Sequence, residues 1–265
     1  MRFRYLLAAA MVAAFLGVTG IASAAKPGPA LTCTGGTFTG DPSTSTFVSI
    51  PSGTYSSITI EGVCNVMPGA EINVTGDLTV APGGLFDAQS APATIMVKHD
   101  VMAGTGSFLG LGCLPDGAHA GHPCASDPSA SSNIYIGGNV SETGASLVLL
   151  NGITVKKNVT LNGGVGNDWV FKWNTIGGNF TASNITPYFF LLGFNTVAKD
   201  VNLSNIWAVD PEDGGFGAVN LVINTIGHDL NCSGLGPRLS GGFIPGAVNN
   251  VGHKTIGQCV GLVGG

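Results

Sequence analysis

The sequence predicts an all-β fold, a single-stranded parallel β-helix in which the chain winds through about eight or nine coils. A short phrase recurs along most of the chain: an apolar pair, a bend, and then Asn, Asp or Cys before another apolar residue. Its copies recur with a period near twenty residues, which is typical of a solenoid. The composition agrees, because 42 glycines and only 9% charged residues suit short strands and turns wound around an apolar core.

The copies of the phrase read INVTGDL, IMVKHDV, IYIGGNV, ITVKKNV, NTIGGNF, NTVAKDV, NTIGHDL and KTIGQCV. We call the Asn, Asp or Cys position the slot, and the slots are Asp77, Asp100, Asn139, Asn158, Asn179, Asp200, Asp229 and Cys259. Apolar residues stand three before, one after and three after most slots, and the side chains one and three after the slot are expected to point inward. The slot itself then points outward, and the Gly-Gly, Thr-Gly, Lys-Lys or Gly-His before it predicts a tight bend. Leucine-rich and helical repeats are not supported, because neither LxxLxLxxN nor a period of 3.6 is present.

The chain divides into a leader, a lead-in and one long domain. Residues 1–25 combine Arg2 and Arg4 with an apolar run and Ala22-Ser23-Ala24, which predicts a secretory signal peptide. Residues 26–49 are expected to form an N-terminal lead-in and cap, and residues 50–265 the β-helix. No later run is long enough to span a bilayer, so we expect a secreted protein without a transmembrane segment, extracellular or at the cell surface, with the periplasm also open.

Charge argues against nucleic acid as a partner. After residue 25 the chain keeps eight Lys and Arg against fifteen Asp and Glu, which gives a net charge of −7. A protein that binds a phosphate backbone carries the opposite balance.

Six cysteines in an exported chain predict disulfides, and sequential pairing is the simplest arrangement. It joins Cys33 to Cys64, Cys113 to Cys124 and Cys232 to Cys259. Bridges at both ends would restrain a solenoid where it frays. The competing interpretation of CLPDGAHAGHPC is a zinc site formed by Cys113, His119, His122 and Cys124.

Two columns of polar residues are expected to stack from coil to coil. Asn174, Asn195 and Asn224 would form a structural row at one corner, satisfying bend backbone groups. An outward threonine column is predicted beside it, at Thr154, Thr175, Thr196, Thr225 and Thr255. Regular threonine arrays resemble the ice-binding faces of some antifreeze proteins, but a single column is more typical of a plain β ladder.

Two coils are longer than the rest, and both gain residues at the same corner. The insertions are SNIWAVDPEDGGFG and SGLGPRLSGGFIPGA, and the second holds Arg238, the one arginine after the leader. Insertions on neighbouring coils project side by side, so residues 204–247 are expected to wall a groove.

Aromatic residues form a second cluster, DWVFKW and YFFLLGF. Outward-facing members would stack on sugars or on a partner, and inward-facing ones would fill the core. The candidates for a binding role are Trp169, Trp173, Tyr188 and Trp207.

The coil pattern over residues 50–262 resembles secreted bacterial parallel β-helix proteins of the pectin-lyase-like and polymer-forming type. The resemblance implies a right-handed, three-sided coil. Polysaccharide lyases on a similar fold hold calcium with carboxylates and use a neutral Arg or Lys as base. By that analogy calcium would lie among Asp200, Asp210, Glu212, Asp213 and Asp229, with Arg238 or Lys199 as base. The acidic triad and arginine-containing strand of those lyases are absent from this sequence, and the slot aspartates are equally explained as turn residues.

Two functions therefore follow as hypotheses. The leading one is an exported, non-enzymatic surface or matrix component that binds glycans or associates with itself and requires no cofactor. Self-association is considered because we expect the C-terminal end of the β-helix to lack a capping helix. The alternative is a calcium-dependent polysaccharide lyase or another glycan-active enzyme that uses the groove at residues 204–247.

Overall fold

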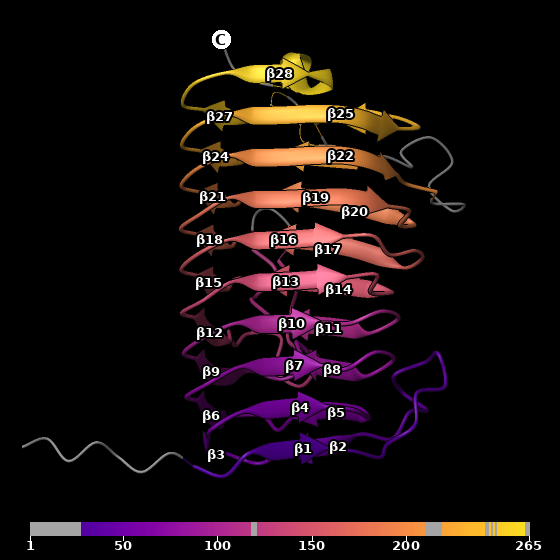
Figure 1. The fold of residues 1–265 in the computed structure, drawn as a ribbon, viewed down its shortest axis with the longest axis vertical. Coiled ribbons are helices and arrows are strands. Elements are labelled where there is room, and N and C mark those ends of the chain that lie inside the picture. The colour runs from indigo at the N-terminus through magenta and orange to yellow at the C-terminus, as the bar shows by residue number, and fades with distance from the viewer. Residues whose placement is uncertain are drawn as a thin grey trace, which may run out of the picture.

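The protein is a parallel β-helix, as predicted, and the computed structural model describes residues 28–117, 121–209, 219–241, 244, 246 and 248–262. Every third strand joins the same sheet, so three parallel sheets run the length of the rod. With the first coil at the bottom of Figure 1, strands cross the front from left to right and the chain returns behind them, which makes the coil right-handed. The first sheet contains ten strands, slightly more than the eight or nine coils expected.

Sheet 1 faces the viewer in Figure 1. Its strands are β1 (Leu31–Cys33), β4 (Ile58–Ile60), β7 (Leu78–Val80), β10 (Val101–Ala103), β13 (Val140–Thr143), β16 (Val159–Asn162), β19 (Phe180–Ile185), β22 (Val201–Trp207), β25 (Leu230–Gly236) and β28 (Thr255–Gly257). Because β1 pairs in register with β4, the solenoid already begins within the segment expected to be a lead-in.

Sheets 2 and 3 form the other two sides. Sheet 2 contains β2 (Val48–Ile50), β5 (Val63–Val66), β8 (Leu85–Ala88), β11 (Phe108–Leu111), β14 (Leu147–Asn151), β17 (Asp168–Lys172), β20 (Phe189–Gly193), β23 (Val219–Val222) and β26 (Leu239–Ser240). Sheet 3 contains β3 (Gly53–Tyr55), β6 (Ala70–Val74), β9 (Ala93–Val97), β12 (Asn133–Ile136), β15 (Thr154–Val155), β18 (Thr175–Ile176), β21 (Thr196–Val197), β24 (Thr225–Ile226) and β27 (Asn250–Val251).

The core is a set of stacked apolar columns. The residue after the slot is buried in successive coils, as the alternation predicts: Leu78, Val101, Val140, Val159, Phe180, Val201 and Leu230 are each at most 1% exposed. Each of these side chains contributes on the order of 1.5–3 kcal/mol by leaving water. In-register parallel pairing stacks equivalent positions above one another. An apolar residue at the same position of each coil therefore builds a continuous core.

A buried asparagine ladder closes the corner between sheets 2 and 3. The backbone N–H and side-chain Nδ2 of Asn174 both donate to Oδ1 of Asn195, at 2.9 Å each. Asn195 donates in the same way to Asn224, and Asn224 to Asn249. The predicted row is therefore confirmed, and Asn249 extends it by one coil.

The residues before Asn174, Asn195 and Asn224 turn the chain in the left-handed region. φ is +60° at Trp173, +61° at Phe194 and +52° at Ile223. Bulky residues rarely adopt this conformation. The buried side-chain hydrogen bonds of the ladder stabilise the corner in spite of this cost.

The last coil has a different register from the one the sequence suggested. Thr255 pairs with Leu230, and the backbone N–H of Lys254 donates to Asp229 Oδ1, so Lys254 occupies the slot in place of Cys259. Asn250, not Thr255, continues the threonine column. Ile256 is 49% exposed, unlike the residues of the other coils that stand three before a slot. The phrase KTIGQCV resembles the repeat in sequence, but its Cys259 lies five residues after Lys254, which occupies the slot.

A short 3-10 helix, η1 (Gln258–Leu262), covers the C-terminal end of sheet 1, so the expectation of an end without a capping helix is wrong. Cys259 is fully buried there, and the Leu262 carbonyl accepts hydrogen bonds from the N–H and Nδ2 of Asn249. The cap thus terminates the asparagine ladder as well as the core.

The three predicted disulfides are present: Cys33–Cys64, Cys113–Cys124 and Cys232–Cys259. The first ties β1 to β5, and the last ties β25 to the capping helix. Three such bridges are typical of a protein from an oxidising compartment. The described part of the chain contains no helix with the length and hydrophobicity that a membrane crossing requires.

Glu142 is a carboxyl group inside the rod. It lies on β13 with its side chain directed into the core, level with Ala103 and Leu161 of the adjoining coils, and is 2% exposed. Its Oε1 accepts a hydrogen bond from the Ala145 N–H, and its Oε2 has no hydrogen-bond partner among the described residues. Burial raises the pKa of Glu142 to about 7 from an ordinary value of 4.5.

The asparagine ladder gives a first testable prediction. Asn195→Ala is expected to lower the free energy of unfolding by roughly 2–4 kcal/mol, because the carbonyls of Phe171 and Gly193 and the N–H of Asn174 lose buried partners. Chemical denaturation measures the change. The exposed neighbour Thr196→Ala should alter stability by less than about 0.5 kcal/mol. Equal losses in the two variants would contradict a special role for the ladder.

Glu142 gives a second prediction. Between pH 4.5 and 7 the unfolded chain has released the Glu142 proton while the folded chain retains it, so stability falls as pH rises. The loss attributable to Glu142 should reach about 3 kcal/mol at pH 7. Glu142→Gln should remove that component, so the difference between wild type and variant should grow across this window. A difference independent of pH would show that the carboxyl is ionised in the folded protein.

Candidate functional site

The corner between sheets 3 and 1 repeats the same three-residue bend in coil after coil. At the second position of this bend, the backbone N–H donates a hydrogen bond to the carbonyl of the second-position residue one coil earlier. This column runs through Gly76, His99, Gly138, Lys157, Gly178, Lys199, His228 and His253, with N···O distances between 2.8 and 3.2 Å. Side chains at this position therefore project from one straight line along the rod.

The third position of the bend is the slot, and its side chains form a hydrogen-bonded ladder. Oδ1 of each slot residue accepts the backbone N–H of the next slot, from Asp77 through to Lys254. Asp200 and Asp229 take part like the asparagines, accepting from the following slot at 3.1 and 3.0 Å. Asp200 and Asp229 therefore have a structural role in the turn, as the turn-residue interpretation predicted.

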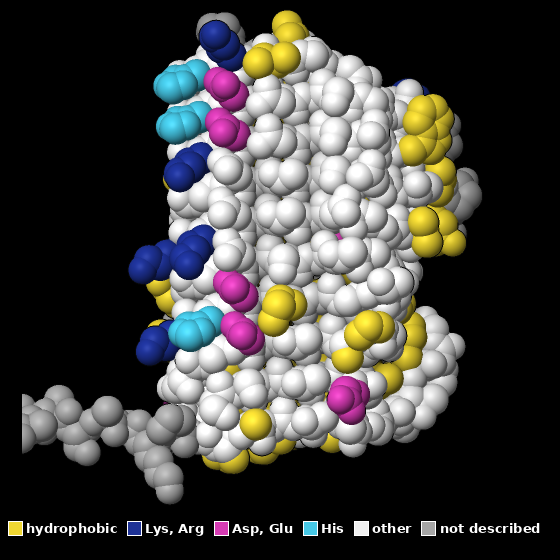
Figure 2. Space-filling view, viewed as in Figure 1, with side chains coloured by type: hydrophobic (Ala, Val, Ile, Leu, Met, Phe, Trp, Pro, Cys, Tyr) yellow, Lys and Arg dark blue, Asp and Glu magenta, His cyan; other side chains and the backbone are white. Residues whose placement is uncertain are grey.

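Cationic side chains gather along the outside of this corner. Figure 2 shows Lys and His in a row along the left edge of the rod, with a row of carboxylates beside it toward sheet 1. We call the following set the basic edge: Lys98, His99, Lys156, Lys157, Lys199, His228, His253 and Lys254. It contains five of the eight lysines and arginines that follow residue 25. A chain of net negative charge thus concentrates its positive charge on one line.

A hollow of about 470 Å³ adjoins the basic edge on the side of sheet 3. Lys98 and Lys156 lie on its two sides, two coils apart, with Gly137 between them. Tyr135 and the half-exposed Met96 line it from sheet 3. The hollow combines two ammonium groups, an aromatic ring and an open glycine surface.

Polar groups continue the hollow toward the N-terminus. Asn73 and Met96 also line a second hollow of about 630 Å³, which contains Glu71. The two hollows therefore adjoin each other along sheet 3, and together we call them the groove, which is cationic at Lys98 and Lys156 and anionic at Glu71.

Carboxylates lie on the other side of the cation row, and they are unevenly distributed along it. Asp100 and Asp200 occupy slots of the fourth and eighth coils, whereas the three coils between them carry asparagine. Lys156 and Lys157 belong to that central segment, where no slot charge offsets them. The potential of the edge is therefore most positive there.

The C-terminal end of the basic edge carries two stacked histidines. The rings of His228 and His253 lie 4.9 Å apart and nearly parallel, with an interplanar angle of 3°. His228 Nδ1 is 3.9 Å from Asp200 Oδ1. Lys254 follows in the last slot, so this end mixes groups of both signs.

The residues proposed for a calcium-dependent site fall into separate places. Lys199, Asp200 and Asp229 lie at the basic edge, before β22 and β25. Arg238 is exposed beyond the far end of β25, so the seven residues of that strand separate it from Asp229. Those seven residues span roughly 20 Å. Asp210, Glu212 and Asp213 lie outside the described residues, and within the described ranges no three His, Cys, Asp or Glu are grouped to hold a metal ion.

The aromatic candidates divide between core and surface. Trp169 is completely buried, and its Nε1 donates to the Gly166 carbonyl, so it fills the core and presents no surface for a glycan. Trp173 is 41% exposed and stacks on Phe194, with ring centroids 4.6 Å apart. Tyr188 and Trp207 are exposed at the corner between sheets 1 and 2. None of the three exposed rings adjoins the basic edge.

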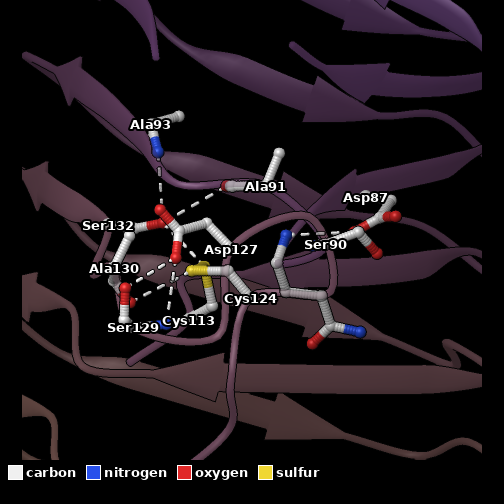
Figure 3. Close-up of a disulfide and its surroundings, with 11 residues drawn as sticks. Asp87, Ser90, Ala91, Ala93, Cys113, Cys124, Asp127, Ser129, Ala130 and Ser132 are labelled. Atoms are coloured by element: carbon white, nitrogen blue, oxygen red, sulfur yellow. Dashed lines mark hydrogen bonds between the residues drawn. A yellow bond between two sulfur atoms is a disulfide. The ribbon is translucent and has the colours of Figure 1, made fainter. Parts of the chain in front are cut away.

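The loop that contains Cys113 and Cys124 folds over the turn between β8 and β9. Figure 3 shows the bridged sulfurs beside Ser132, whose hydroxyl accepts from the N–H of Ala93. Because the two sulfurs are bonded to each other, they cannot serve as thiolate ligands for zinc. Burial and the nearby Lys172 lower the pKa of His122, and His119 lies outside the described residues.

The basic edge is a site that sequence reasoning missed. The Lys-Lys and Gly-His pairs were interpreted only as bends, although their recurrence at one position already indicated a line of cations. Comparison of the chain with models of known families, with curated proteins and with solved structures finds no match. The geometry of the edge and its groove therefore carries the functional interpretation.

Proposed function

We propose that this protein is an exported, non-enzymatic β-helix protein that binds an anionic polysaccharide along the basic edge. One observation carries the proposal. Lys98 and Lys156 lie on the two sides of a hollow that also contains Tyr135 and the bare backbone of Gly137. Such a hollow suits a sugar ring with a carboxylate or sulfate group, since the ammonium groups attract the charge and the phenol ring packs on the sugar.

The shape and chemistry of the groove favour a glycan over other polyanions. The groove is open and runs along the rod, so an extended glycan can bind along its length without its terminus entering a closed pocket. Asn73 and Thr75 line it with groups that can hydrogen-bond to hydroxyls. A net charge of −7 on the chain after residue 25 disfavours a long nucleic acid, which would meet repulsion away from the edge.

Export is supported by the N-terminal 25 residues and by the three disulfides. In this proposal the protein works outside the cell or at its surface, where acidic glycans are abundant. We propose binding without turnover, because Arg238 and the slot aspartates lie at opposite ends of β25 and do not converge on one bond. The capping helix η1 favours a partner along the side of the rod over association through its C-terminal end.

The test compares removal of the two lysines at the hollow with removal of the arginine on another corner of the rod. Lys98→Gln with Lys156→Gln should weaken binding of a fluorescently labelled acidic decasaccharide by roughly five- to twenty-fold at low salt, as expected for two exposed ion pairs. Arg238→Gln, which removes one charge on another corner, should change it by less than about two-fold. Fluorescence anisotropy measures the affinity, and ultraviolet absorbance follows any unsaturated product.

Two results would overturn the proposal. The first is wild-type protein that binds no acidic oligosaccharide. The second is binding that Arg238→Gln reduces as much as the double variant. Release of unsaturated product that depends on calcium would favour the lyase alternative instead.

A further inference from the structure

From the fourth to the eighth coil the lysines of the basic edge recur on every second coil, and His228 and His253 then follow on the ninth and tenth coils. The second bend position carries His99, Lys157 and Lys199 in the fourth, sixth and eighth coils, and glycine in the fifth and seventh. At the first bend position Lys98 and Lys156 are separated by Gly137 and followed by Gly177, and Ala198 stands there in the eighth coil. In this part of the rod, coils with lysine therefore alternate with coils that have glycine at both bend positions.

Coil packing fixes these glycines. A Cβ atom added to Gly137 would lie 2.4 Å from the Lys98 carbonyl oxygen, and one added to Gly177 would lie 2.4 Å from the Lys156 carbonyl oxygen. A Cβ carbon does not approach a backbone atom to within 3 Å in folded proteins, so neither position can carry a side chain without moving a coil. The spacing of the lysines is thus built into the rod.

Two coils correspond to roughly 9.6 Å along the rod. We propose, on the basis of the function proposed above, that the ligand is a linear polysaccharide with one anionic group per disaccharide, lying parallel to the rod axis from Lys98 to Lys199. An extended β-linked disaccharide has about this length. A nucleic acid strand carries its charges far more densely, about one per 3.4 Å in a duplex.

The surrounding charges orient the polymer. Glu71 lies in the groove on the N-terminal side of Lys98, so an anionic chain is repelled in that direction. Asn139, Asn158 and Asn179 fill the slots between the fourth and eighth coils without adding negative charge. The favourable path therefore leads from the hollow at Lys98 toward the C-terminus.

Chain length tests the axial arrangement. A disaccharide should occupy the hollow between Lys98 and Lys156, so Lys199→Gln should leave its affinity unchanged within about two-fold. An octasaccharide reaches the eighth coil, so the same variant should weaken it by about three- to five-fold. The Lys98→Gln and Lys156→Gln double variant should weaken both ligands, and Arg238→Gln neither.

Charge spacing tests the period. An octasaccharide with a uronate on every sugar should bind with an affinity within about three-fold of one with a uronate on every second sugar, because the added uronates face coils without a lysine. A larger gain in affinity for the fully charged octasaccharide would overturn the two-coil period. So would an equal effect of Lys199→Gln on the disaccharide and the octasaccharide.

These outcomes separate the inference from the proposed function. Binding that needs Lys98 and Lys156 but shows neither the dependence on length nor the similar affinity of the two octasaccharides would retain the function and discard the axial period. Absence of binding to every acidic oligosaccharide would discard both. Equal affinity for single-stranded DNA of the same length, with the same response to the variants, would contradict the assignment of a glycan.

Discussion

In-register hydrogen bonding between successive coils is the constraint on which the rest of this structure depends. Each strand pairs with its equivalent one coil away, so a position keeps its neighbours along the whole rod. Corners are the weak point of such a design, because their backbone groups leave the regular strand pairing. Here side-chain ladders satisfy two of the three corners: the half-buried slot ladder before sheet 1 and the buried asparagine ladder before sheet 3. The core columns can stack only because these corners are fixed.

The ends of the rod need a different solution, since an end coil has a neighbour on one side only. At the C-terminal end the capping helix accepts the last hydrogen bonds of the asparagine ladder at Leu262, and Cys259 is bonded to Cys232 of β25. The same short helix therefore completes polar and apolar interactions that would otherwise face water. At the other end the Cys33–Cys64 bridge ties the three-residue strand β1 to the next coil.

The sequence was informative wherever a local pattern determined the structure. The coil period, the inward columns and the asparagine row followed from repeated residue types at fixed positions, and the disulfide pairing followed from joining the cysteines in sequential order. The register of the last coil was predicted wrongly. Lys254 and Asn250 differ from the residue types that the other coils have at these two positions, whereas KTIG resembles the start of the repeated phrase. Glu142 occupies a position that the alternation makes inward, and a charged residue gives no local signal that it is buried. The basic edge escaped notice because its members are far apart in sequence and meet only when coils stack.

That last point links the fold to its surface chemistry. A bend residue must either pack as glycine on the carbonyl below, as Gly137 does, or extend its side chain outward, as Lys156 does. From the fourth to the eighth coil the two choices alternate, which spaces the lysines by two coils, whereas His228 and His253 occupy successive coils beyond them. A globular fold would have to position each lysine through separate contacts. In a solenoid the coil rise positions all of them, so a regular polymer is the natural partner of a regular rod.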